Sequence, residues 1–226
     1  MIQDPLDVFA KSSLKITPSL IEYEVGSEIE LFVYNYLRRV FDNYDRIVFL
    51  SFFDAYSSFV KFLIRSIGKE KVDKILKNCE LISIYPKGET DYTMSIKNLD
   101  YPTIIGKLRL FLDEISGRTI ILALGLDFYS IFLSEKSFIS LFPRIAKLPS
   151  NYKDLSLTVV LNVKIFSDKV KEIINSFSFN IARLGIENVN NRLLRYFILI
   201  RTIYLNYNLF KWYYDVIGDR IIFRTP

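Results

Sequence analysis

A loop between a predicted strand and a predicted helix has the layout of a phosphate-binding site but not its residues. The stretch SLIEYEVGSEIELFVYNYL, residues 19–37, indicates a short strand, a turn around one glycine and a long apolar helix. A working loop reads G-x-x-x-x-G-K-S/T, in which the glycines let the backbone wrap the phosphates, the lysine reaches them and the hydroxyl holds magnesium. Those glycine, glycine, lysine and hydroxyl positions are taken here by Tyr23, Glu28, Ile29 and Glu30.

These replacements predict that the loop binds no triphosphate. Gly26 and Ser27 keep small side chains, but the side chain of Glu28 obstructs the close backbone approach that glycine permits. Ile29 removes the cation, while Glu28 and Glu30 place negative charge where the phosphates would lie. Carboxylates at the start of a helix stabilise its positive end, as a bound phosphate would. We therefore expect no nucleotide cofactor.

The chain also lacks the usual catalytic side chains. It has no histidine, which excludes Ser-His-Asp and Cys-His catalysis and removes the commonest metal ligand. Its single cysteine, Cys79, can form neither an internal disulfide nor a zinc cluster, and we interpret it as a packing residue. The sequence predicts no catalytic residue and no metal site.

Carboxylates are the remaining candidates for chemistry. Glu22 and Glu24 alternate along the first predicted strand, so they should point to the same face and could form a paired-carboxylate site. We interpret them as structural residues at the strand end, because no histidine or metal cluster accompanies them. A residual enzyme that uses Glu22, Glu24 or Asp54 stays open as the third hypothesis.

Composition predicts one cytosolic α/β domain. A chain of 226 residues, half of them hydrophobic, is ordinary for a single domain with a large sheet. No stretch of about 18 to 20 residues is free of charge, as a membrane-spanning helix needs to be, and the N-terminus is polar rather than a signal peptide. The abundance of Ile, Lys, Tyr and Phe, with few Cys and Met, favours a thermophilic source.

Strands and helices alternate along residues 19–185, after a lead-in of residues 1–18 that carries turn and cap residues. This alternation predicts a largely parallel sheet with helices on both faces. Residues 192–226 are β-rich and joined by short links, which predicts an antiparallel β-meander extending the sheet of a single domain, 1–226. The expected strands are 19–24, 46–53, 80–85, 119–125, 155–163, 177–185, 193–205, 209–217 and 220–224. The expected helices are 29–41, 55–67, 69–78, 102–115, 135–148 and 167–176, with a further helix after the strand in the apolar run 119–133.

Several of these segments resemble archaeal KaiC-like and RadA-like ATPases. Residues 20–37 resemble their strand, phosphate loop and helix, and residues 46–63 resemble their second strand. Residues 117–133 stand where the Walker B strand would be, and residues 213–226 are similar to the closing hairpin. The resemblance covers 20–226 and implies a RecA-like fold. The chain also resembles archaeal proteins of unknown function thought to be degenerate members of this group.

The resemblance also implies where catalytic acids should lie, and those positions have changed. The first acidic position of the second strand becomes Phe53, and the second is Asp54. The expected Walker B aspartate falls at Ala123, and the nearest acid, Asp127, lies about a turn beyond it. Phosphoryl transfer needs positioning, magnesium and charge neutralisation together. We therefore expect a pseudo-ATPase that does not hydrolyse ATP.

The C-terminal region combines basic and aromatic side chains on a chain of net charge +5. Such residues can follow a phosphate backbone and stack bases, anchor a protein interface, or pack a β-meander on a core. We expect a regulatory or scaffolding protein that binds a second copy of itself or an active RecA-like or KaiC-like relative. The alternative is a nucleic-acid-binding accessory protein of DNA recombination or repair. The candidate contacts are Arg192, Arg195, Arg201, Lys211 and Trp212.

Overall fold

The computed structural model describes residues 4–88 and 91–224, and its strands form one ten-stranded sheet. The strand order is β10-β9-β8-β7-β1-β6-β5-β2-β3-β4. Pairing is parallel from β7 to β4 and antiparallel from β7 to β10. The strands are β1 (Ser19–Tyr23), β2 (Arg46–Phe52), β3 (Glu80–Ile84), β4 (Met94–Ile96), β5 (Thr119–Leu124), β6 (Leu155–Asn162), β7 (Asn180–Val189), β8 (Arg192–Arg201), β9 (Lys211–Ile217) and β10 (Arg220–Arg224).

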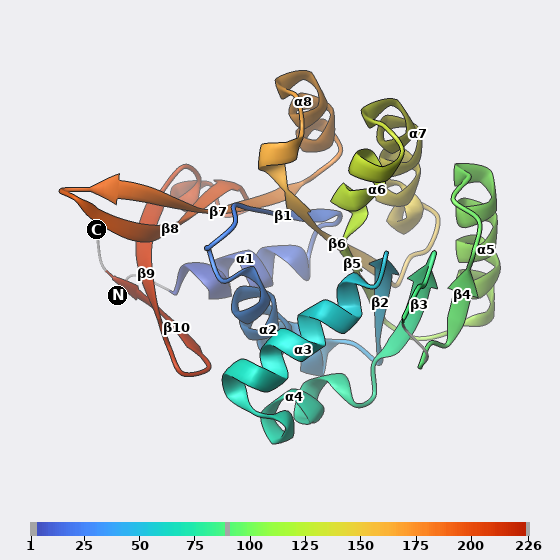
Figure 1. Cartoon of the computed structure of the whole chain (residues 1–226), viewed down its shortest axis with the longest axis horizontal. Helices are drawn as coiled ribbons and strands as arrows, with labels where there is room; N and C mark the ends of the chain where they lie inside the picture. The colour runs from blue at the N-terminus through green and yellow to red at the C-terminus, as the bar shows by residue number, and fades with distance from the viewer. Residues whose placement is uncertain (1–3, 89–90, 225–226) are drawn as a thin grey trace.

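Helices cover both faces of the parallel part of the sheet (Figure 1). Helices α1 to α4 pack on one face and α5 to α8 on the other, each with its own buried hydrophobic cluster. Neighbouring residues of a strand contribute to different clusters, as Leu20 and Ile21 of β1 do, because successive side chains point to opposite faces. The helices are α1 (Pro5–Ser13), α2 (Ile29–Val40), α3 (Ala55–Ile67), α4 (Lys69–Leu76), α5 (Tyr101–Glu114), α6 (Leu126–Phe132), α7 (Glu135–Ala146) and α8 (Asp168–Ser176).

The antiparallel strands β7 to β10, here called the meander, curl against α2. Every residue of α2 from Leu31 to Leu37 is buried. Trp212 and Ile221 of the meander belong to the same hydrophobic cluster as this helix. The side-chain amide of Asn35 donates to the backbone carbonyl of Asp219 at 2.8 Å in the β9–β10 turn. The predicted parallel sheet and antiparallel extension are both confirmed.

Two elements were not expected from the sequence. Helix α1 lies inside the predicted lead-in, where Asp4 accepts a hydrogen bond from the Leu6 backbone N–H at 2.9 Å and Phe9 is fully buried. So short a helix depends on tertiary packing rather than on its own propensity. Strand β4 lies in the polar stretch after β3 and pairs with β3 over three residues, too few for a recognisable alternation.

Within the described ranges, the helices are all too short or too polar to cross a lipid bilayer.

Candidate functional site

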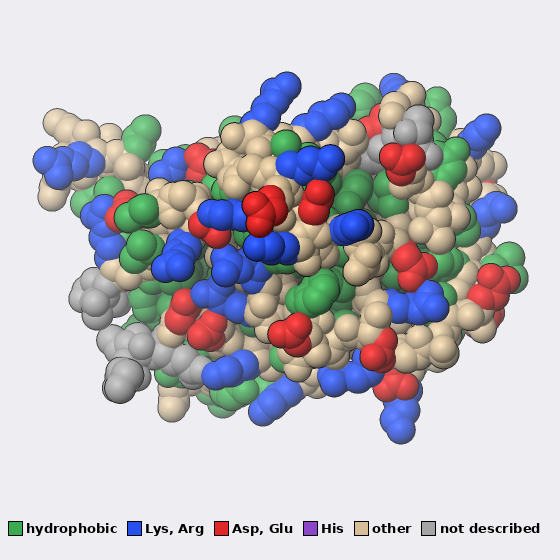
Figure 2. Space-filling model, turned by 90° about the horizontal axis from the view of Figure 1, so that it is seen from below, with side chains coloured by type: hydrophobic (Ala, Val, Ile, Leu, Met, Phe, Trp, Pro, Cys, Tyr) green, Lys and Arg blue, Asp and Glu red, His purple; other side chains and the backbone are tan. Residues whose placement is uncertain are grey.

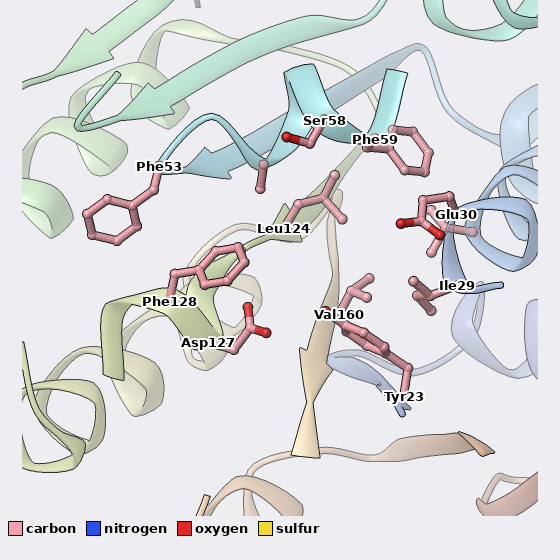
Figure 3. Close-up of a pocket in the computed structure, with 13 residues that line it drawn as sticks. Tyr23, Ile29, Glu30, Phe53, Ser58, Phe59, Leu124, Asp127, Phe128 and Val160 are labelled. Atoms are coloured by element: carbon pink, nitrogen blue, oxygen red, sulfur yellow. The ribbon is translucent and has the colours of Figure 1, made fainter. Parts of the chain in front are cut away.

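A cavity of about 190 Å³ lies where four neighbouring strands end (Figure 3). Tyr23 ends β1, Val160 lies near the end of β6, Leu124 ends β5 and Phe53 directly follows β2. The crevice at the carboxyl ends of parallel strands is where open α/β sheets bind ligands. The other lining residues are Ile29, Glu30 and Val33 from α2, Ala55, Ser58 and Phe59 from α3, and Gly125, Asp127 and Phe128 at the start of α6.

The lining is mostly apolar and contains two carboxylates. Glu30 from α2 and Asp127 from α6 point into the cavity from opposite sides (Figure 3). The lining residues include neither lysine nor arginine. The cavity is therefore mostly apolar, and its charged lining residues are both acidic.

Asp127 is the more buried of the two acids, with 3% of its surface exposed. Its Oδ2 accepts the backbone N–H of Asn162 at 3.3 Å, and the hydroxyl of Tyr23 donates to its carboxylate. Burial raises the pKa of Asp127 to about 6, against the opposing effect of these hydrogen bonds. The carboxylate is therefore stabilised by dipoles rather than by a cation.

Glu30 lies at the start of α2. Burial raises its pKa, the backbone N–H of Glu30 itself donates to the carboxylate and lowers it, and the nearby charge of Glu28 raises it again. Burial also raises the pKa of Tyr23, to which the charges of Asp127 and Glu30 add. The hydroxyl of Tyr23 is thus affected by the charges of both acids. The carboxylate of Glu30 lies at the positive end of α2.

The six loop residues singled out by the sequence fall into two groups. Three line the cavity and three lie beside the meander. The cavity group is Tyr23, Ile29 and Glu30, and the meander group is Gly26, Ser27 and Glu28.

The meander holds this loop by its backbone. Arg195 of β8 donates from Nε to the carbonyl of Gly26 at 3.0 Å and from its guanidinium to Oε1 of Glu28 at 2.8 Å. The hydroxyl of Tyr214 in β9 donates to the carbonyl of Ser27. Glu28 has a φ of +54° and stands at the N-cap of α2 without a side-chain capping bond. Its carboxylate therefore neutralises Arg195 rather than the helix end.

The other predicted acids lie outside the cavity. Glu22 is fully buried and pairs with Arg183 at 2.6 Å, while Glu24 pairs with Lys164 at 3.2 Å. They form two separate ion pairs rather than one paired-carboxylate site. Asp54 accepts two backbone N–H groups of the loop after β3, the nearer at 2.7 Å, and so holds that loop.

Cys79 is half-buried, and its thiol donates to the carbonyl of Ile75 at 3.3 Å. Burial raises the pKa of this thiol to about 12. Because the thiolate is the reactive form, the environment agrees with its interpretation as a packing residue.

Four of the five C-terminal candidates are held within the fold. Arg195 binds the loop, and Arg201 donates to two backbone carbonyls at and just after the end of α8. Lys211 forms an ion pair with Glu187. Trp212 is buried, because alternation along β9 turns it toward the core. The expectation that Trp212 contacts a partner is therefore corrected.

The fifth candidate, Arg192, is exposed at the β7–β8 hairpin. On the face seen in Figure 2, lysine and arginine side chains are interspersed with aspartate and glutamate. Single-stranded nucleic acids are bound by a positive groove whose aromatic side chains stack the bases. With four candidates engaged internally, the described residues favour a structural role for this basic and aromatic set.

Comparison with known proteins supports the fold. No protein-family model matches the chain, and no curated protein matches it. It is similar to the crystal structure of the KaiC-like protein PH0186 from Pyrococcus horikoshii OT3, with 10% identity, a TM-score of 0.64, and coverage of 92% of this chain and 88% of that one. The chain has a RecA-like fold. The chain is also similar to the structure of PH0250 from the same organism, with 17% identity, a TM-score of 0.64, and coverage of 88% of this chain and 95% of that one.

Sequence reasoning missed the role of Asp127 in this RecA-like fold. In the sequence, Asp127 is the acid nearest to the changed Walker B position, and it is not among the predicted site residues. Ala123 of β5 is fully buried on the face away from the cavity, whereas Asp127 reaches it from the first turn of α6. The available signal was a single acid directly after the strand and Gly125, inside a long apolar run.

Proposed function

We propose that this chain is a non-catalytic RecA-like domain that acts as a regulatory or scaffolding protein, binding itself or an active RecA-like or KaiC-like relative. The proposal depends on one observation, which is that the loop before α2 and the start of that helix are occupied by groups of the chain itself. The carbonyls of this loop and Glu28 are engaged by the meander, and Glu30 occupies the start of the helix. The chain thus fills with its own groups the place where a phosphate would bind.

Charge argues further against nucleotide hydrolysis. Ile29 stands at the lysine position, and the cavity lining contains two carboxylates and no basic residue. At an effective dielectric constant of about 20, two like charges about 4 Å apart repel by about 4 kcal/mol. A triphosphate would meet this repulsion from Glu30 and Asp127 without the cations that phosphoryl transfer requires.

We expect ATP to leave the melting temperature unchanged. Full-length protein is heated with millimolar ATP and magnesium, with magnesium alone and inorganic triphosphate as controls for ionic effects. A ligand that binds only the folded state raises the melting temperature, and the rise grows with the ratio of ligand concentration to Kd. A rise of several degrees with ATP and magnesium, absent from both controls, would contradict the proposal.

A binding role is supported by exposed apolar side chains between β8 and β9. Ile203, Leu205, Leu209 and Phe210 are 39%, 76%, 77% and 53% exposed. Exposed apolar groups concentrated in one short segment are typical of protein interaction sites. This segment lies at the meander end of the molecule, opposite α5 (Figure 1).

We expect combined Leu205→Ser and Leu209→Asn substitutions to weaken association at least about tenfold, because each removes exposed apolar contact area. Asparagine suits position 209, where φ is +65°. Size-exclusion chromatography with light scattering measures self-association, and a pull-down measures capture of a RecA-like relative. Leu110→Ser on α5 is the matched control, because Leu110 is 64% exposed. A wild-type monomer that captures no such relative would refute the proposal.

A further inference from the structure

The two acids of the cavity lack a cationic partner. Asp127 is held by a backbone N–H and the Tyr23 hydroxyl, and Glu30 by its own backbone N–H. In the described part of the chain, neither acid forms an ion pair with lysine or arginine. Buried charges in proteins are usually paired, because hydrogen bonds from neutral groups replace only part of their lost hydration. The cavity therefore presents two under-compensated carboxylates to whatever enters it.

The remaining walls suit a small apolar body. Leu124 and Val160 lie between the two acids, and Phe128 lies beside Asp127 (Figure 3). The ring of Phe53, another lining residue, lies 4.7 Å from that of Phe132 and 5.8 Å from that of Tyr85, measured between centroids. The volume of about 190 Å³ is below the roughly 300–1,000 Å³ of pockets that hold drug-sized ligands. A ligand must therefore be small.

We propose that this cavity binds a small organic cation, an ammonium or guanidinium group carried on a short apolar body. The charged group lies between Glu30 and Asp127 beside the ring of Tyr23, where it forms charge-assisted hydrogen bonds and a cation–π contact. The apolar body packs against Leu124, Val160 and Phe128. This inference goes beyond the proposed function, which concerns protein partners and the loss of nucleotide chemistry.

Other ligand classes fit these walls less well. An anion would be repelled by both acids. A hard metal ion takes about six or more oxygen ligands, whereas the side chains of this cavity offer two carboxylates and the hydroxyls of Tyr23 and Ser58. No group of three or more His, Cys, Asp or Glu suited to a metal occurs in residues 4–88 and 91–224.

Calorimetric titration of the full chain with phenethylamine and with butylguanidine tests the proposal at about pH 7.5, where both ligands are cationic and Asp127 is mostly ionised. Phenethyl alcohol and phenylacetate serve as the neutral and anionic counterparts of the first ligand. We expect the cations to bind and both counterparts to bind at least about tenfold more weakly, since a hydrogen bond to a charged group contributes about 1.5–3 kcal/mol.

Two variants locate the binding. Glu30→Gln should weaken cation binding at least about tenfold. Glu28→Gln is the matched control, because Glu28 carries the same charge two positions away but pairs with Arg195 outside the cavity, and it should retain wild-type affinity. Circular dichroism checks that both variants fold. Absence of cation binding, equal binding of the alcohol, or an unchanged affinity in Glu30→Gln would each overturn the proposal.

Discussion

Replacing Gly125 with alanine should lower the free energy of unfolding by about 3 kcal/mol or more. Gly125 has a φ of +72°, which costs other residues about 1–2 kcal/mol. An added Cβ would also lie 2.6 Å from the backbone carbonyl oxygen of Phe52 and 2.6 Å from Cβ of Ala55. Overpacking against such groups typically costs about 1–3 kcal/mol more. The close approach of the β5–α6 turn to the β2–α3 turn thus requires glycine.

Gly106→Ala is the matched control for this substitution. Gly106 is exposed within α5, and a Cβ there would meet no atom within 4 Å. It should stabilise the protein by about 0.5–1 kcal/mol, the usual gain of alanine over glycine in a helix. Urea denaturation measures both changes. A Gly125→Ala variant as stable as the wild type would show that the two turns do not approach each other this closely.

Replacing Asp127 with asparagine should raise the free energy of unfolding at about pH 7.5 by on the order of 3 kcal/mol. Burial raises the pKa of Asp127 from an ordinary value of 3.8 to about 6. The folded state therefore holds its proton more tightly than the unfolded state, and the stability contribution of this group falls as the pH rises between these two values. Above about pH 6 the full cost of burying the charge remains. An amide avoids that cost and can still accept the Asn162 N–H.

Urea denaturation between about pH 4 and pH 7.5 checks the sign as well as the size. The stability advantage of Asp127→Asn over the wild type should grow as the pH rises to about 6 and then level off. Asp100→Asn should instead be less stable than the wild type, by an amount that changes little above about pH 5, because a lowered pKa puts the pH dependence of this group at and below its ordinary value of 3.8. Asp100 caps α5 by accepting the Thr103 N–H at 2.9 Å, and its pKa is lowered by that hydrogen bond. An Asp127→Asn variant no more stable than the wild type at neutral pH would contradict the burial of an unpaired charge.

The same substitution links stability to the proposed ligand. Asp127→Asn should stabilise the free protein but remove one of the two charges offered to a cation. A group that lowers stability at a cavity is typical of a binding site, where stability and function make opposing demands. Measuring the free energy of unfolding and the cation affinity of this one variant separates the contribution of Asp127 to the fold from its contribution to ligand binding.

The sequence by itself determined the class of the sheet. Apolar strands alternating with helices specify a parallel sheet covered on both faces, and the short links after residue 192 specify the antiparallel meander. The apolar surface of the helix at 29–41 likewise indicated burial, which the observed α2 shows. These features are local patterns of hydrophobicity and turn residues, and such patterns report which faces of an element are buried. The sequence did not predict helix α1 and strand β4, because their hydrophobic patterns are short.

Only the tertiary structure decided which side chains meet. Strand order places β6 between β5 and β1, so that the ends of the three strands adjoin and Asp127 reaches Tyr23. The curl of the meander brings Arg195 to the loop before α2 and buries Trp212, so residues that looked like partner contacts serve the fold. Such contacts join segments far apart in the chain. They depend on strand order and sheet curvature, about which the local periodicity of a sequence carries no information.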